Sequence, residues 1–303
     1  MNRANATAMA GIAKGLKAAT RAPANAFGVF RRWPVLPAIV IVVLFVAAIF
    51  APWLEPHNPL TLVIRDRLQP PAWYAEGTSQ HLLGTDNVGR DILSRLIHAA
   101  RITVVVVMIS LGTGMIIGSV LGLIGGYFGG MVDEGIMRIV DLWSALPYLL
   151  IILTMVVVMG QGYGILIAAL ALISWPGAVR LVRAETLRLK TRDYVFLAKV
   201  SGASTFRIIY RHILPSVLDV MVVSATLHTG TLILTEATLS FLGAGVPPPN
   251  PSWGSMVADG RQYIREAWWV AFFPGLCILL VVMAGNFMGD WLRDHFDPRL
   301  RQT

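Results

Sequence analysis

The chain has 303 residues, of which 55% are hydrophobic and 14% are charged, and its formal net charge is +8. Soluble domains carry about 25% charged residues, so this composition excludes an ordinary soluble protein and indicates an integral membrane protein. The single cysteine, Cys277, cannot form a disulfide within the chain and cannot make a metal site by itself.

The first segment, residues 1–33, contains six lysines and arginines and no acidic residue. The positive-inside rule therefore predicts a cytoplasmic N-terminal tail. Residues 34–54 are predicted to be the first transmembrane helix, because the apolar stretch is too long for a signal-peptide core and has no cleavage site near its end. Residues 55–101 follow as a polar loop, whose five basic and five acidic residues indicate an extracytoplasmic position.

The loop contains the string GTDNVGRD at residues 84–91, which predicts a turn followed by an amphipathic helix. A turn held by an internal Asp–Arg pair is favoured over an ion or phosphate site built on the same side chains. The residues of this extracytoplasmic motif are Gly84, Thr85, Asp86, Gly89, Arg90 and Asp91.

Residues 102–292 are predicted to form a core of five further transmembrane helices. In the first of them, glycine recurs at every fourth position, which puts a smooth stripe on one helix face where another helix can approach closely. The stripe consists of Gly114, Gly118, Gly122, Gly126 and Gly130. Ordinary helix packing is favoured over a seam near a moving core. The next span is expected over residues 139–159, with Pro147 inside it, after a short cytoplasmic loop around Asp133.

Residues 192–215 are the most polar long stretch between the apolar spans, and their pattern predicts two short helices. Asp193 can start the first helix, Gly202 breaks it because glycine adopts positive φ, and Ser204 can cap the second helix. Pro215 is expected to end this polar segment and to open the next span. The apolar stripe of the second helix consists of Phe206, Ile209 and Ile213.

This stretch has two interpretations. It is either an interfacial hairpin that lies among lipid headgroups, or a docking element that fits a groove on a soluble partner. Residues 180–211 contain eight lysines and arginines against two acidic residues, which predicts a cytoplasmic position. With six spans, both termini are then cytoplasmic, and residues 293–303 form a C-terminal tail.

Glu236 lies near the outer end of the fifth predicted span, and a carboxylate within a span suggests a functional site. It is a candidate for the substrate path. A structural role is favoured, in which the carboxylate pairs with backbone groups or with Arg261 at the outer surface.

Enzyme chemistry is not expected in this chain. None of the four lysines follows a glycine, so the chain has no GxxxxGK[ST] loop for nucleotide phosphates. The six histidines are scattered, and a metal site would need distant residues to converge. We therefore predict no catalytic residue, no cofactor or metal bound by this chain, and no nucleic-acid partner.

Four motifs resemble the import permeases of the bacterial ATP-binding-cassette (ABC) class, of the dipeptide/oligopeptide/nickel type. The first resembles the EAA loop of that family: Ala198, Gly202, Leu214 and Pro215 match it, whereas Phe196, Leu197 and His212 depart from it. The other three are GTDNVGRD, EATLSFLGAGVPPPNPSWG at residues 236–254, and GDWLRDHFDPR at residues 289–299.

The resemblance implies the C-type permease subunit of such an importer, with a type I permease fold and a multi-pass position in the bacterial inner membrane. It implies that residues 192–215 act as a cytoplasmic coupling helix element that seats on an ATPase. Its implied partners are a second (B-type) permease, two ATPase subunits that carry ATP and Mg²⁺, an extracytoplasmic substrate-binding protein and membrane lipid. The implied docking residues are Ala198, Gly202, Ala203, Phe206, Ile209, Leu214 and Pro215.

Two other functions stay open at this point. One is a secondary transporter or channel that works without an ATPase, and the other is a membrane scaffold without a transport path. A lipid-bound hairpin would tolerate changes at Gly202, whereas a coupling element would not. The sequence does not name a substrate, and a dipeptide, a longer peptide, a nickel complex, glutathione and an opine are all compatible with it.

Overall fold

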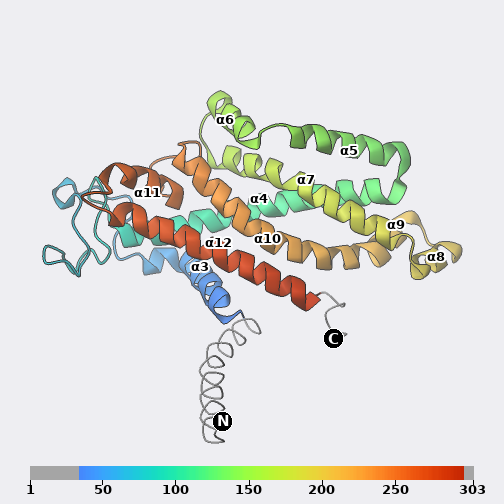
Figure 1. Ribbon diagram of the computed structural model, residues 1–303, viewed down its shortest axis with the longest axis horizontal. Helices are drawn as coiled ribbons and strands as arrows, with labels where there is room; N and C mark the ends of the chain where they lie inside the picture. Colours follow the sequence, from blue (N-terminus) through green and yellow to red (C-terminus); the bar gives the residue numbers. More distant parts are fainter. Residues whose placement is uncertain (1–33, 297–303) are drawn as a thin grey trace, which may run out of the picture.

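The computed structural model describes residues 34–296, which are mostly helical. Figure 1 shows an elongated bundle with the loop of residues 55–91 and helix α11 (Trp253–Gly260) at one end. Helices α8 (Asp193–Val200) and α9 (Thr205–Ile208) lie at the opposite end. We call these the loop end and the hairpin end. The predicted N-terminal tail lies outside the described residues.

Five helical units within the described residues are long and apolar enough to cross a membrane, and a bent pair of helices makes a sixth. The five are α3 (Val35–Leu54), α4 (Ile92–Phe128), α7 (Tyr163–Leu189), the α9–α10 unit (Thr205–Phe241) and α12 (Trp269–Phe296). The bent pair is α5 (Gly130–Ala145) with α6 (Tyr148–Met159). These helices confirm the predicted all-α membrane fold. Two short 3₁₀ turns also occur among the described residues, η1 (Ile64–Asp66) and η3 (Arg261–Tyr263).

Helix α4 begins earlier than predicted and joins two expected elements. The side chain of Asp91 accepts a hydrogen bond from the backbone N–H of Ser94 and caps the helix. From Ile92 the helix runs for 37 residues without a break, so the amphipathic helix expected after the turn and the second predicted span form one helix. At about 1.5 Å per residue, α4 is roughly 55 Å long, well beyond a hydrocarbon core of about 30 Å. The helix is therefore longer than one crossing of the apolar layer requires.

The third predicted span is not one continuous helix. Helix α5 begins at Gly130, so the expected cytoplasmic loop around Asp133 is helical. The chain then breaks at Leu146, whose φ of −85° and ψ of 138° are extended, and α6 leaves at 81° to α5. Pro147 explains the break, because a proline disfavours helical angles in the residue before it and cannot donate a backbone hydrogen bond.

The glycine stripe of α4 lies against α7. Gly114, Gly118, Gly122 and Gly126 face, in that order, Ser174, Ala178, Val182 and Thr186 of α7. A Cβ atom added at Gly122 would lie 2.8 Å from the Cβ of Val182, and one added at Gly126 would lie 2.7 Å from the Cβ of Thr186. Both separations are shorter than normal carbon–carbon contact, so the two backbones approach as closely as they do because the side chains are missing. Gly130 lies outside this contact and starts α5.

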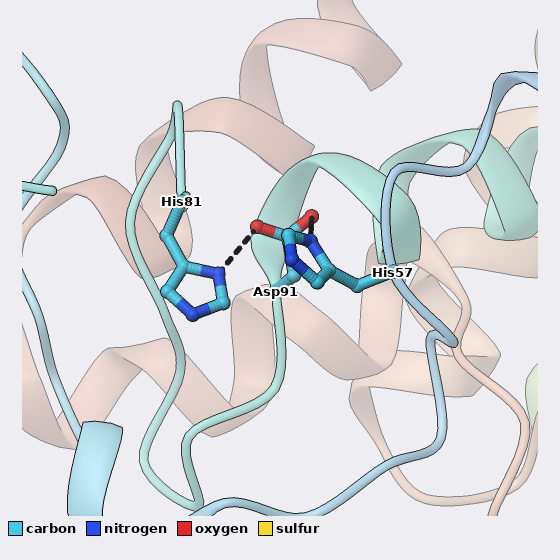
Figure 2. Close-up of side chains that lie close together, drawn as sticks. All are labelled: His57, His81 and Asp91. Carbon is cyan, nitrogen blue, oxygen red and sulfur yellow. Dashed lines mark hydrogen bonds and ion pairs between the residues drawn. The ribbon is translucent and has the colours of Figure 1, made fainter. Parts of the chain in front are cut away.

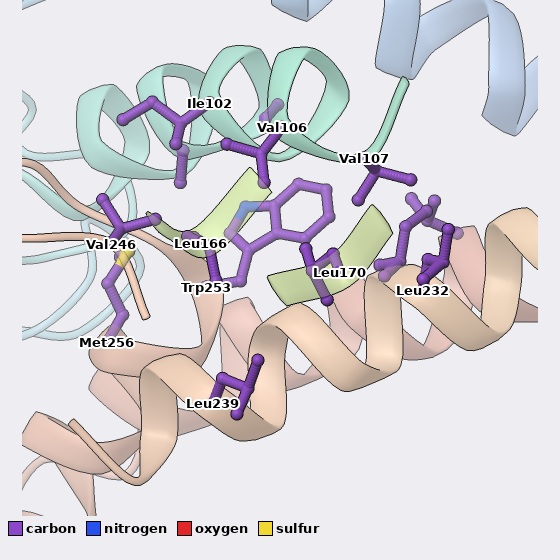
Figure 3. Packing of buried hydrophobic residues seen from close by; sticks show 14 of the residues in the cluster. Ile102, Val106, Val107, Leu166, Leu170, Leu232, Leu239, Val246, Trp253 and Met256 are labelled. Atoms are coloured by element: carbon purple, nitrogen blue, oxygen red, sulfur yellow. The ribbon is translucent and has the colours of Figure 1, made fainter. Parts of the chain in front are cut away.

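The described core continues to the loop end through a buried tryptophan (Figure 3). Trp253 of α11 is 3% exposed, and its indole N–H donates to the carbonyl of Leu96 in α4 at 3.1 Å. Around it the figure shows Val106 of α4, Leu166 of α7 and Leu239 of α10 (Leu214–Phe241). One side chain thus ties α11, which belongs to the Gly/Pro-rich stretch after α10, to the transmembrane helices.

Candidate functional site

The coupling segment, residues 192–215, forms a helical hairpin with a turn at Gly202. Gly202 has a φ of +80°, which confirms the sequence-based expectation that glycine is needed there. Its N–H donates to the carbonyl of Lys199 at 3.1 Å, and the N–H of Ala203 donates to that of Ala198 at 3.0 Å. These two hydrogen bonds satisfy carbonyls in the last turn of α8, in the pattern typical of a left-handed glycine C-cap.

Pro215 opens the fifth span, as predicted, but the second helix of the hairpin runs into that span without a break. The Ser204 side chain caps α9, as expected. Residues 209–213 then form a π-helical turn (η2), and α10 (Leu214–Phe241) continues from it with Pro215 in its first turn. The wide turn tolerates the proline, because no α-helical hydrogen bond has to be donated from that position. The hairpin is therefore joined directly to the fifth span.

The π turn also changes which residues share a face. Ile208 and Ile213, five positions apart, are both fully buried, whereas Phe206 is 77% exposed. The predicted stripe of Phe206, Ile209 and Ile213 is wrong for that reason, since it assumed an α-helical period throughout. Ile208 and Ile213 pack with Val195 of α8 against a cluster that contains Leu123 of α4 and two residues of α7, Val182 and Leu189.

The opposite face of the hairpin is apolar and exposed. Phe206 stacks on Tyr210 with ring planes 3° apart, and Phe196 and Val200 of α8 are 66% and 70% exposed. Three exposed cations, Lys199, Arg207 and Arg211, each adjoin one of these apolar residues in the sequence. An exposed apolar surface with charged neighbours indicates a contact with another molecule. Of the predicted docking residues, Phe206 lies on it, whereas Ala198, Ala203, Ile209 and Leu214 pack toward the core.

Sequence reasoning did not include Phe196, Leu197, Val200 and Tyr210 in the docking set. Two of these, Phe196 and Leu197, are positions where the chain departs from the family pattern of the EAA loop. The signal that could have found the whole group is the clustering of large apolar side chains in a stretch that is otherwise rich in basic residues.

The platform under the hairpin is fixed by polar contacts between three helices. Arg183 of α7 donates to Asp133 of α5, with Nη2 and Oδ2 2.6 Å apart. Lys190, just after α7, donates to the carbonyl of Gly126 in α4 at 2.8 Å. The hairpin therefore rests on helices that are bonded to one another.

At the loop end, the string GTDNVGRD forms a turn built around Asp86. Gly84 and Gly89 have φ of 81° and 78°. The carboxylate of Asp86 accepts from the backbone N–H of Arg90 at 2.9 Å and from its guanidinium at 2.6 Å. Arg95 of α4 lies 3.5 Å from the same carboxylate. The Asp–Arg pair of the favoured structural interpretation is thus present.

A second acidic residue joins this pair from α11. Asp259 lies 3.7 Å from Arg90, and burial raises the pKa of its carboxyl while Arg90 and Arg95 act in the opposite direction. The backbone of the motif is held as well. The N–H of Thr85 donates to the carbonyl of Gln69 at 3.0 Å, and the carbonyl of Thr85 accepts from the indole N–H of Trp269 in α12. Both arginines face carboxylates, so they do not present a phosphate site.

Asp91, the last residue of the motif, lies beside two histidines of the loop, His57 and His81 (Figure 2). The ligand atoms of the three side chains lie within 4.8 Å of one another. The convergence of distant residues that a metal site would need is thus found for these two histidines and Asp91.

Glu236 is completely buried within the chain. Its carboxylate accepts from the hydroxyl of Ser240 at 2.7 Å and from that of Thr103 in α4 at 3.4 Å. The predicted alternative of a pair with Arg261 is not made; the Arg261 guanidinium lies over the Phe241 ring instead, 5.8 Å from its centroid. In this conformation Glu236 links α10 to α4.

The sequence matches a known family and several named relatives. Residues 114–302 match the model of the family described as binding-protein-dependent transport system inner membrane component. The chain is 48% identical over 263 residues to the dipeptide transport system permease protein DppC of Escherichia coli K12, and the aligned region covers 87% of each sequence. It is 43% identical over 256 residues to the di/tripeptide transport system permease protein DppC of Pseudomonas aeruginosa, and the aligned region covers 84% of each sequence.

A solved structure shares the fold. A chain of the MetNI methionine ABC transporter, in an inward-facing conformation, aligns with a TM-score of 0.54 and 22% identity. The alignment covers 68% of this chain and 98% of that one. At this level of identity the likeness concerns the arrangement of the helices.

Proposed function

Because the chain belongs to the family of binding-protein-dependent transport system inner membrane components, we propose that it is the permease subunit of an ABC importer for dipeptides. The family places the chain in the bacterial inner membrane as part of an ATP-driven importer. The choice of dipeptides rests on the relatives named as dipeptide permeases, which align along most of this chain at up to 48% identity. Longer peptides and other small solutes are the alternatives that the experiment below separates.

The observation that carries the coupling part of the proposal is the two-sided hairpin. Its inner face, with Val195, Ile208 and Ile213, is buried against α4 and α7. Its outer face exposes Phe206 and Tyr210. A hairpin that lay in lipid headgroups would need no fixed platform, whereas a docking element has to transmit force and must be held rigidly.

The hairpin offers a direct mechanical route through the membrane. Residues from Thr205 to Phe241 form one continuous helical unit, so a displacement of α9 moves α10 along its whole length. Near its far end, Glu236 bonds Thr103 of α4. When the ATPases close on ATP, their movement of the hairpin would tilt α10 and change the packing at the loop end, where the substrate-binding protein delivers its solute.

The proposed assembly contains this chain, a second permease, two ATPase subunits and an extracytoplasmic binding protein. ATP and Mg²⁺ bind to the ATPase subunits, and this chain contributes no hydrolytic residue. The two permeases enclose the path between them.

Reconstitution tests the proposal. The complex is placed in liposomes with ATP on the ATPase side, and uptake of a labelled dipeptide is measured with the binding protein present. We expect uptake of the labelled dipeptide to require ATP and every subunit. An excess of unlabelled dipeptide should abolish this uptake by competition. Uptake by this chain without ATPases would favour the secondary transporter or channel. Competition by longer peptides, with none by dipeptides, would contradict the substrate.

A further inference from the structure

Three segments that are separate in the sequence meet at the loop end. His57 lies just after α3, His81 lies in the loop, and Asp91 caps α4 (Figure 2). The His81 Nδ1 atom lies 3.0 Å from Asp91 Oδ1, and the His57 Nδ1 atom lies 4.0 Å from Asp91 Oδ2. The two imidazole rings are tilted against each other with centroids 4.9 Å apart.

Asp91 is a buried charge that lacks an arginine or lysine partner among the described residues. Its side chain is 2% exposed, and its described ion-pair contacts are with the two histidines alone. The neighbouring arginines, Arg90 and Arg95, are directed to Asp86 instead. Buried charged groups in proteins are paired with an opposite charge, hydrogen-bonded or bound to a metal ion. A metal ion bound between the two imidazoles would place a positive charge beside Asp91.

The carboxylate of Asp91 is held in place by Ser94. Its Oδ2 accepts from the backbone N–H of Ser94 at 2.8 Å and from the Ser94 hydroxyl at 2.7 Å. The same hydroxyl oxygen accepts from the backbone N–H of His57 at 3.0 Å. Ser94 therefore positions two members of the cluster, as hydrogen-bonding neighbours of metal ligands do. The Oδ1 atom of Asp91 faces His81.

We propose that His57, His81 and Asp91 bind a divalent transition-metal ion, with Zn²⁺ the ion that suits them best. Two imidazole nitrogens and one carboxylate oxygen are a usual zinc ligand set, and a water molecule completes the tetrahedron. Ligand atoms at about 2.0 Å from a tetrahedral ion lie roughly 3.3 Å apart. With one ligand atom taken from each residue, the three atoms lie within 4.8 Å of one another, so a bound ion would draw them closer together.

Binding requires only a small rearrangement. The His81 nitrogen that faces Asp91 must present its lone pair, so the neutral ring carries its proton on the other nitrogen when the metal is bound. The His57 side chain is 41% exposed, so it can turn inward by the short distance needed and leaves the ion a way in from solvent. The bound ion would fasten both ends of residues 57–91 to the start of α4.

The site is tested with the full-length chain, purified in detergent, stripped with a chelator and titrated with Zn²⁺ against a fluorescent competitor. Variants His57→Gln and His81→Gln remove one ligand each, and the exposed His57 leaves the fold intact when it is replaced. His98→Gln is the matched control, because His98 lies at the same end and contacts a carboxylate, Glu55, at 2.9 Å. Elution on size exclusion checks that each variant is folded.

We expect about one Zn²⁺ per chain, bound at least tenfold more weakly by His57→Gln and His81→Gln and unchanged by His98→Gln. X-ray absorption should show nitrogen and oxygen ligands, with imidazole, and no sulfur. The proposal is overturned if the wild-type chain binds no Zn²⁺, if the two ligand variants bind it as the wild type does, or if His98→Gln loses it equally.

Discussion

Replacement of Gly202 by valine tests whether the hairpin transmits force. The residue has a φ of +80°, where valine is strained, and nothing lies within 4 Å of the position that a Cβ atom would take. The effect therefore arises from the backbone alone, and holding a β-branched residue there costs about 1–3 kcal/mol. The local turn can relieve this strain only by giving up the bonds from Gly202 and Ala203 to α8.

This strain energy is large enough to weaken docking of the ATPase, but too small to prevent insertion of the chain into the membrane. A change of about 1.4 kcal/mol shifts a binding equilibrium tenfold, so we expect docking of the ATPase to weaken about tenfold or more. The chain should still insert normally, because no apolar residue of a span is altered. The matched control is Gly202→Asn, since asparagine tolerates positive φ far better than valine.

The assay combines co-purification of the ATPase subunits with substrate-stimulated ATP hydrolysis by the reconstituted complex. We expect Gly202→Val to lose one or both, and Gly202→Asn to stay close to the wild type. Wild-type docking and stimulated hydrolysis in the valine variant would refute the coupling role, and the secondary transporter or channel would then gain support.

Three further outcomes are expected. In a background without the native cysteine, a cysteine at Ser79 should react with an impermeant reagent from outside the cell and one at Ser204 only after lysis; the reverse pattern would contradict the topology. Gly118→Leu should reduce recovery of the assembled complex far more than Leu121→Ala, because the new side chain has to push α4 from α7; equal recovery would remove the packing argument. Asp86→Asn should lower the free energy of unfolding by about 3–5 kcal/mol, because the buried Arg95 loses the carboxylate that lies 3.5 Å from it, and an unchanged melting temperature would disprove this.

Much of the fold followed from local patterns. The long apolar segments predicted the membrane class and nearly all the spans, since hydropathy over about 20 residues measures the cost of placing a helix in lipid. The turn at Gly202 and the cap at Ser204 were also predicted, because a positive φ and a capping hydroxyl depend on the residue itself and its immediate neighbours. The period of four in α4 predicted a close contact, although it did not name α7 as the partner.

Other features depended on the tertiary structure. The sequence placed a boundary at Pro215, but the π turn before it lets the helix continue and rotates Phe206 away from Ile213. Local patterns cannot show this, because the width of a helical turn is decided by what the two sides pack against. The sequence places Pro147 within a predicted span, but it does not show the 81° bend that this proline allows. That bend is seen only in the folded chain, where α5 and α6 pack beside α7.

The candidate metal site depended entirely on the fold. His57 and Asp91 are 34 positions apart in the numbering of the chain, and no short motif joins them. They meet because α3 and α4 pack side by side and because the loop between them returns to the start of α4, where Asp86 and the two glycines fix the turn. The sequence alone determined which side chains could bind a metal, and only the packing of the two helices decided that they lie together.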